Sequence, residues 1–120
     1  MKNLILTISL SLISLSAVAQ NKNAKTIIEV DGVCGMCKAR IEKAAFGVKG
    51  VKSAVWDTET HYLNLIFDER KTNIKTISEN IAEAGHDTKM IEATEEAYNS
   101  IHDCCKYRDE KVKEDHKKKE

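Results

Sequence analysis

The sequence places two cysteines, Cys34 and Cys37, between a segment with the pattern of a β-strand and a segment with the pattern of an α-helix. Residues 24–30 have the strand pattern, and from Lys38 onward apolar residues recur at intervals of three and four. Unpaired N–H groups at a helix start favour anions and lower the pKa of a thiol there. Thiolates select soft ions such as Cu(I) and Zn(II) over Mg and Ca. The spacing therefore predicts a metal-binding loop, although redox enzymes and structural disulfides use the same C-x-x-C pattern.

The rest of the apolar pattern predicts further strands and a second helix. Residues 62–67 alternate between apolar and polar, which is the period of a half-buried strand. A short connection joins them to a strand predicted at residues 51–57, so the two form a hairpin. A helix over residues 73–84 ends at Gly85, and residues 88–93 form a last strand. This β-α-β-β-α-β order predicts a ferredoxin-like α+β sandwich, with a four-stranded antiparallel sheet and two helices on one face.

The predicted topology brings three loops to one end of the domain. They are the cysteine loop, the hairpin that carries His61 and the loop that carries His86. His86 is a candidate metal ligand because neutral imidazole binds copper and zinc, and the alternative is a surface histidine without a partner. For His61 we favour a solvated turn residue.

Residues 1–19 have the pattern of a secretory signal peptide. A short positive start, an apolar stretch and the small residues Ala17 and Ala19 before Gln20 are typical of a cleaved signal. The apolar stretch is shorter than the roughly 20 residues of a membrane-spanning helix, so we expect no membrane anchor after cleavage. The mature chain is then periplasmic or secreted, and it has one more acidic than basic residue. That balance argues against nucleic acid as a partner.

Beyond the domain predicted over residues 24–93, the chain continues with an extension over residues 94–107. Thr94 is a candidate cap for a short helix, which leads to the sequence H-D-C-C. About ten helical residues span about 15 Å, which is far enough to bring that sequence back to the cysteine loop. The candidate ligands in the extension are His102, Cys104 and Cys105.

The two C-terminal cysteines also have other roles open to them. Cys104 and Cys105 could form disulfides with the loop cysteines, form a separate structural disulfide, remain buried thiols or lie in an oligomer contact. A disulfide between adjacent cysteines is rare because the ring is strained. The remaining residues, 108–120, are nearly all charged, which predicts a disordered and solvated tail that includes His116.

Residues 25–93 resemble the heavy-metal-associated domain family, which includes copper chaperones, the metal-binding domains of copper-transporting ATPases and the periplasmic mercury-binding protein. The resemblance rests on Gly32, Cys34, Cys37, the V-K-G-V turn at residues 48–51 and the A-G-H-D sequence at residues 84–87. It implies that both loop cysteines bind the metal and that a residue after the second helix, here His86, tunes the site. The family's methionine before the first cysteine is absent. Met36 stands between the cysteines instead, where we expect it to pack inward.

The resemblance implies a metal carrier rather than an enzyme, and the signal pattern of residues 1–19 predicts that this carrier is exported and soluble. It would bind Cu(I) through Cys34 and Cys37 and pass it to a partner such as a metal-transporting ATPase. The alternative cargo is zinc or mercury, held by a scavenging protein. A rival interpretation is a thiol–disulfide oxidoreductase, but the chain has no proline, whereas the thioredoxin family requires a cis-proline facing its active cysteines. A third is a disulfide-stabilised binding module without metal.

Overall fold

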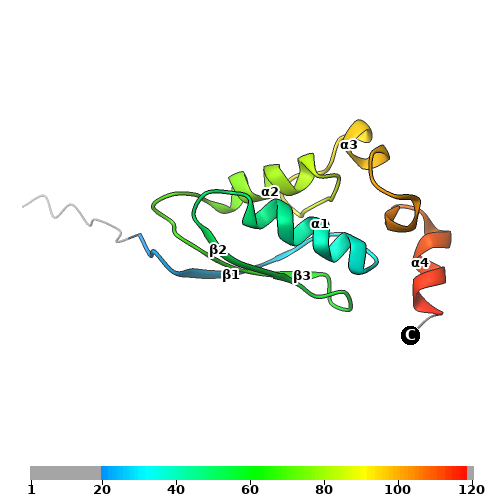
Figure 1. Ribbon diagram of the computed structural model, residues 1–120, viewed down its shortest axis with the longest axis horizontal. Helices are drawn as coiled ribbons and strands as arrows, with labels where there is room; N and C mark the ends of the chain where they lie inside the picture. The colour runs from blue at the N-terminus through cyan, green and yellow to red at the C-terminus, as the bar shows by residue number, and fades with distance from the viewer. Residues whose placement is uncertain (1–19, 119–120) are drawn as a thin grey trace, which may run out of the picture.

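Three antiparallel strands form the sheet of the computed structural model, which describes residues 20–118 (Figure 1). They are β1 (Ala24–Glu29), β2 (Val51–Trp56) and β3 (Tyr62–Phe67), and β3 lies between the other two. The alternation predicted for β3 is observed, because Leu63 and Leu65 are buried while the intervening Asn64 is exposed. One face of the sheet is therefore turned toward the core.

Helices α1 (Gly35–Phe46) and α2 (Ile74–Glu83) cover that face of the sheet together (Figure 1). Each helix buries residues four positions apart, the spacing that keeps side chains on one helical face. These residues are Ile41 and Ala45 of α1 and Ile77 and Ile81 of α2. The arrangement agrees with the predicted ferredoxin-like class, in which both helices pack on one side of the sheet.

The segment predicted as the fourth strand, residues 88–93, folds differently. It carries an isolated antiparallel bridge between Thr88 and Val30. The Thr88 N–H then donates to the Ile91 carbonyl oxygen at 2.8 Å, and the Thr88 hydroxyl accepts from the Ile91 N–H at 3.0 Å. The threonine side chain thus gives the backbone a local turn in place of ladder bonds. The described residues form a three-stranded sheet, and the expectation of a fourth strand is corrected.

The C-terminal extension contains a short helix, α3 (Glu95–Asn99), and a 3-10 turn, η1 (Asp103–Cys105). Thr94 caps α3 as predicted, because its hydroxyl accepts from the Ala97 N–H at 3.1 Å. After α3 the chain returns toward the end of the domain at which α1 begins (Figure 1). The turn η1 ends there, beside the cysteine loop.

A further helix, α4 (Glu110–Lys117), occupies the region predicted to be a disordered tail. The Asp109 carboxylate caps it by accepting from the Lys111 N–H at 2.9 Å. Glu110 lies in the first turn and basic residues lie in the last, an order that complements the helix dipole. Capping and charge order therefore stabilise a helix that has no buried residue, which is why the apolar pattern gave no sign of it.

Tyr107 and Arg108 fasten the extension to the loop after α2. The Tyr107 hydroxyl donates to the Gly85 carbonyl oxygen at 2.7 Å and accepts from the Asp87 N–H at 3.0 Å. Arg108 pairs with the Asp87 carboxylate at 2.8 Å and donates to the Ala93 carbonyl oxygen at 2.9 Å. These bonds hold the extension against the domain and fix where η1 lies.

The signal peptide predicted at residues 1–19 lies outside the described residues. Within residues 20–118, no helix is both long enough and apolar enough to cross a membrane.

Candidate metal centre

The cysteine loop has the geometry predicted from its spacing. Cys34 is the N-cap of α1 with an extended backbone, and Cys37 follows in the first turn, where it is fully buried. Their Sγ atoms lie 3.6 Å apart. Gly32 precedes them in close contact with the domain, since a Cβ there would lie 3.0 Å from the Trp56 ring. The chain therefore packs closely against Trp56 at Gly32 and then places both thiols at the start of α1.

The extension brings the second cysteine pair to this loop. The Cys105 Sγ lies 3.4 Å from the Cys34 Sγ and 4.0 Å from the Cys104 Sγ. The sulfur atoms of Cys34, Cys104 and Cys105 all lie within 4.8 Å of one another. The Cys37 sulfur is near Cys34 but does not belong to that mutual group. Residues separated by about 70 positions thus form one thiol cluster.

Met36 contributes a fifth sulfur atom to this cluster. Its Sδ lies 3.6 Å from the Cys104 Sγ, and its side chain is 45% exposed. The expectation that Met36 packs inward is therefore corrected. As the second residue of a helix that begins at Gly35, it points its thioether away from the core and toward the extension.

Burial and hydrogen bonding separate the pKa values of the thiols. Partial burial acts to raise the pKa of Cys34, but the N–H groups of Cys37 and Met36 and the neighbouring thiols lower it below its ordinary value. Burial raises the pKa of Cys37. Burial, together with the hydrogen bond to Cys37, raises the pKa of Cys105 to about 12. Cys34 is therefore the thiol of the cluster that most readily becomes a thiolate.

His86 is buried with both ring nitrogens occupied. Its Nδ1 lies 2.8 Å from the Asp31 carbonyl oxygen, and its Nε2 lies 3.3 Å from the Arg40 guanidinium. A carbonyl only accepts and a guanidinium only donates, so the ring is neutral with its proton on Nδ1. Burial lowers the pKa of His86 to about 4, which agrees with that form. The structure thus gives this predicted ligand a structural role in place of a free donor.

The other histidines also lie outside the thiol cluster. The His102 side chain is exposed and is not among the donors that meet within 4.8 Å in the described part of the chain. His61 stacks on Trp56 with ring centroids 5.4 Å apart, and its φ is 64°. The His116 Nε2 lies 3.0 Å from the Cys104 carbonyl oxygen, so it contacts the backbone of the cluster from α4. Of the six predicted ligands, the structure brings together the four cysteines.

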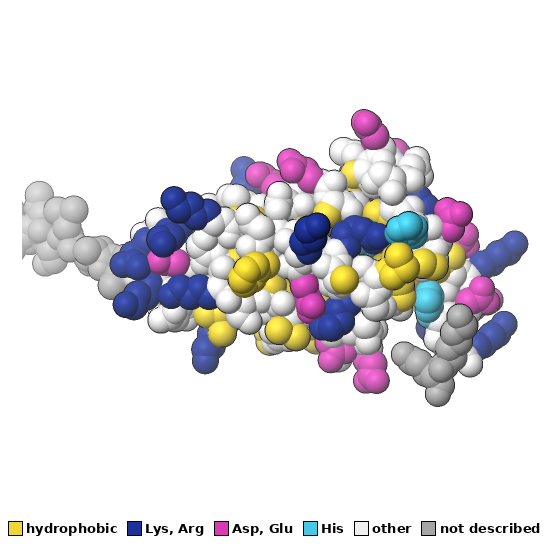
Figure 2. All heavy atoms as spheres, in the orientation of Figure 1, with side chains coloured by type: hydrophobic (Ala, Val, Ile, Leu, Met, Phe, Trp, Pro, Cys, Tyr) yellow, Lys and Arg dark blue, Asp and Glu magenta, His cyan; other side chains and the backbone are white. Residues whose placement is uncertain are grey.

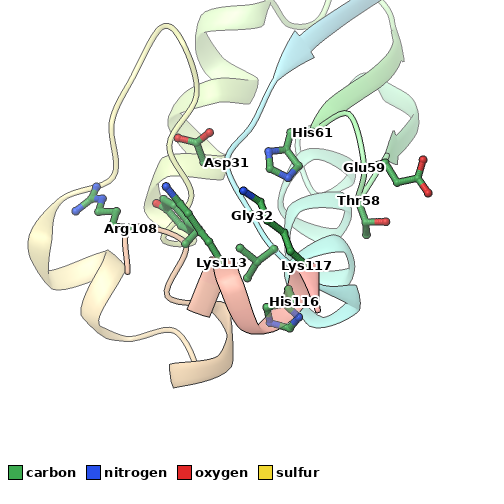
Figure 3. A pocket seen from close by; sticks show the side chains of 11 residues that line it. Asp31, Gly32, Thr58, Glu59, His61, Arg108, Lys113, His116 and Lys117 are labelled. Carbon is green, nitrogen blue, oxygen red and sulfur yellow. The ribbon is translucent and has the colours of Figure 1, made fainter. Parts of the chain in front are cut away.

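A cavity of about 690 Å³ adjoins the cluster between the β2–β3 hairpin and α4. Figure 3 shows His61 of the hairpin on one side and Lys113, His116 and Lys117 of α4 on the other. The residues that line it do not include any of the four cysteines. The cavity therefore borders the metal-binding candidate without containing it.

The cluster lies at the end of the molecule where α4 is found. At that end, Figure 2 shows exposed side chains of the hydrophobic class, which includes Cys and Met, beside histidine, acidic and basic side chains. Cys104 and Met36 are exposed there, whereas Cys37 and Cys105 are buried. The sulfur donors thus run from the core to the surface.

Residues 27–87, just over half of the chain, match the heavy-metal-associated domain family. The chain belongs to this family. Both loop cysteines lie within the matched residues, and so do Gly32 and His86. Cys104 and Cys105 lie beyond them, so membership of the heavy-metal-associated family assigns them no role.

The relatives of this heavy-metal-associated domain include a copper chaperone, a metallochaperone and the soluble region of a P-type ATPase. The copper chaperone CopZ of Staphylococcus haemolyticus is 30% identical over 64 residues, which span 52% of this chain and 94% of that protein. The solved CopZ metallochaperone is 29% identical with a TM-score of 0.52, over 54% of this chain and 98% of that one. The water-soluble region of the P-type ATPase CopA from Bacillus subtilis is 30% identical with a TM-score of 0.52, over 57% of this chain and 46% of that one. The chain is thus a metal-binding domain of chaperone type and not an enzyme.

Proposed function

We propose that the protein is an exported carrier that takes up Cu(I) at its thiol cluster and transfers it to a partner protein. One observation carries the proposal: the extension places Cys105 3.4 Å from Cys34, beside the loop that the family uses for metal. At a metal–sulfur bond of about 2.3 Å, two ligand sulfurs lie roughly 4 Å apart. The sulfur separations of 3.4 to 4.0 Å in the cluster are close to that value.

The sulfur arrangement favours Cu(I) over Zn(II). A tetrahedral zinc site needs four ligands that are all about 3.8 Å from one another. The Cys37 sulfur lies outside the group whose members are all within 4.8 Å, so the four thiols do not form that tetrahedron. Soft, lower-coordinate Cu(I) is suited to thiolate and thioether donors. The copper chaperone relatives support the same choice.

Transfer requires that an incoming thiolate can reach the ion. Cys104 is exposed and Cys34 is half-buried, so a partner can approach the cluster from that side. The likeness to the soluble region of a P-type ATPase supports a metal-transporting ATPase as that partner. The proposal of export rests on the signal pattern of residues 1–19. We expect N-terminal sequencing to show that the exported protein begins at Gln20.

Native mass spectrometry of the reduced mature chain with Cu(I), Zn(II) and Hg(II) tests the proposal. We expect tight binding of Cu(I) with weaker retention of Zn(II). Cys34→Ser combined with Cys37→Ser should sharply weaken Cu(I) binding, because the loop then offers no thiolate and only the sulfurs outside it remain. Circular dichroism checks that this variant still folds, since Cys37 is part of the core. Full Cu(I) affinity in the folded double variant would contradict the proposal.

A further inference from the structure

The cluster holds more sulfur than one copper ion uses. Its donors are the thiols of Cys34, Cys37, Cys104 and Cys105 and the thioether of Met36. Cu(I) is satisfied by about two or three sulfur ligands. Two ions with three sulfurs each, one of them shared, would use all five donors.

The contacts divide the five sulfurs into an inner and an outer set. Cys34 lies 3.6 Å from Cys37 and 3.4 Å from Cys105, and this inner set includes both fully buried thiols. Cys104 lies 3.6 Å from the Met36 Sδ and 4.0 Å from Cys105, and this outer set includes both exposed donors. Cys105 belongs to both sets.

We propose that Met36 and Cys104 form an outer subsite that binds a second Cu(I), with the Cys105 thiolate bridging the two ions. The proposal rests on the proposed function, because the inner set must first accept Cu(I). Binding changes no oxidation state: Cys104 forms a Cu–S bond and releases its proton to solvent, and the Met36 thioether donates a lone pair without losing a proton. The protein supplies all the ligands.

The helix α4 contacts the turn that carries Cys104. The His116 Nε2 lies 3.0 Å from the Cys104 carbonyl oxygen, which steadies the turn that presents the thiol. Each Cu(I) that binds offsets the negative charge of the thiolates that hold it, so it lowers the repulsion between them. Because Met36 and Cys104 are exposed, the outer ion is the one that an incoming ligand reaches first.

The experiment titrates Cu(I) into the reduced mature chain in competition with a Cu(I) chelator and counts the bound ions by native mass spectrometry. We expect two Cu(I) ions per chain. Met36→Leu keeps the volume and helix propensity of the side chain but removes the thioether, and it should lower the affinity for the second ion at least about tenfold. Cys104→Ser should leave one ion. Met90→Leu is the matched control, because Met90 is also exposed but takes no part in the sulfur contacts.

The outcomes separate this inference from the proposed function. One Cu(I) per wild-type chain at every chelator concentration would overturn the outer subsite and leave the carrier function intact. Two ions whose affinities are the same in the wild type, Met36→Leu and Cys104→Ser would also overturn it. If the wild type binds no Cu(I), the proposed function itself fails.

Discussion

At the scale of single residues, burial and, for Cys34, the position at the start of α1 set the pKa of each thiol and imidazole. Cys34 caps α1 and has a lowered pKa, whereas Cys37, one turn later, is buried and has a raised one. His86 has a lowered pKa because it is buried, and its ring is committed to Asp31 and Arg40. The thiols are therefore the candidate metal donors, and His86 supports the fold.

The buried His86 predicts a pH dependence of stability. An unfolded histidine binds a proton below its ordinary pKa of 6.5, but the folded one does so only near pH 4. The metal-free, reduced protein should therefore lose up to about 3 kcal/mol of unfolding free energy as the pH falls from 6.5 to about 4. Denaturant unfolding across that range measures it.

His86→Gln is the matched variant for this prediction. It should be less stable than the wild type at pH 7 and should lack the loss that histidine protonation causes between pH 6.5 and pH 4. Asp31, whose pKa burial raises, is present in both proteins, so the difference between their curves isolates His86. Parallel curves for the two proteins would show that His86 is not held neutral.

At the scale of elements, the extension works as an arm that positions the second cysteine pair. Buried side chains of α3 and the segments after it join the domain core, among them Tyr98, Ile101 and Tyr107. Removing the whole arm would remove these core contacts as well as the thiols. Substitutions at its anchor points are therefore the sharper way to test what the arm does.

Arg108→Met should speed the release of Cu(I) to a chelator. Arg108 is partly buried, forms an ion pair with Asp87 and donates a hydrogen bond to the Ala93 carbonyl oxygen. Losing these interactions should weaken docking of the arm by about 1.5 kcal/mol or more. If the arm must undock before Cu(I) leaves, the rate of Cu(I) release rises roughly tenfold. Stopped-flow absorbance of the chelator complex measures it.

Arg70→Met is the control for this variant. Arg70 also pairs with an aspartate, Asp68, but from a turn outside the extension. It should change the release rate little. Equal release rates in Arg108→Met and the wild type would show that the arm does not gate the ion.

The sequence allowed the elements up to α2 to be predicted because each has a clear apolar period. The period of two in β3 and the period of four in α1 and α2 each describe a buried face. The prediction of a strand at residues 88–93 was wrong because the Thr88 hydroxyl accepts a hydrogen bond from the nearby Ile91 N–H, which an apolar pattern does not reveal. The helix α4 was missed because it buries no residue.

The sequence predicted the position of the two loop cysteines from their spacing, whereas the return of Cys104 and Cys105 to the loop was predicted only from the reach of the extension. Cys34 and Cys37 are fixed by their own loop. The closeness of Cys105 to that loop depends on Tyr107 and Arg108 bonding to the segment after α2, which no local pattern encodes. The contact between Met36 and Cys104 depends on the same docking.

At the scale of the whole molecule, a heavy-metal-associated domain and a C-terminal arm close around one sulfur cluster. The matched domain supplies Cys34 and Cys37, and the residues beyond it supply Cys104 and Cys105. In the proposed carrier, the second thiol pair adds ligands to a loop that by itself offers two thiols. The arm is then part of the proposed metal centre.

The coordination number of the first bound ion tests this claim most directly. X-ray absorption at the copper edge, with one equivalent of Cu(I) on the reduced mature chain, should give three sulfur ligands, from Cys34, Cys37 and Cys105. Cys105→Ser should reduce the number to two. Two sulfur ligands in both proteins would contradict the account, because the ion would then be held by the loop alone.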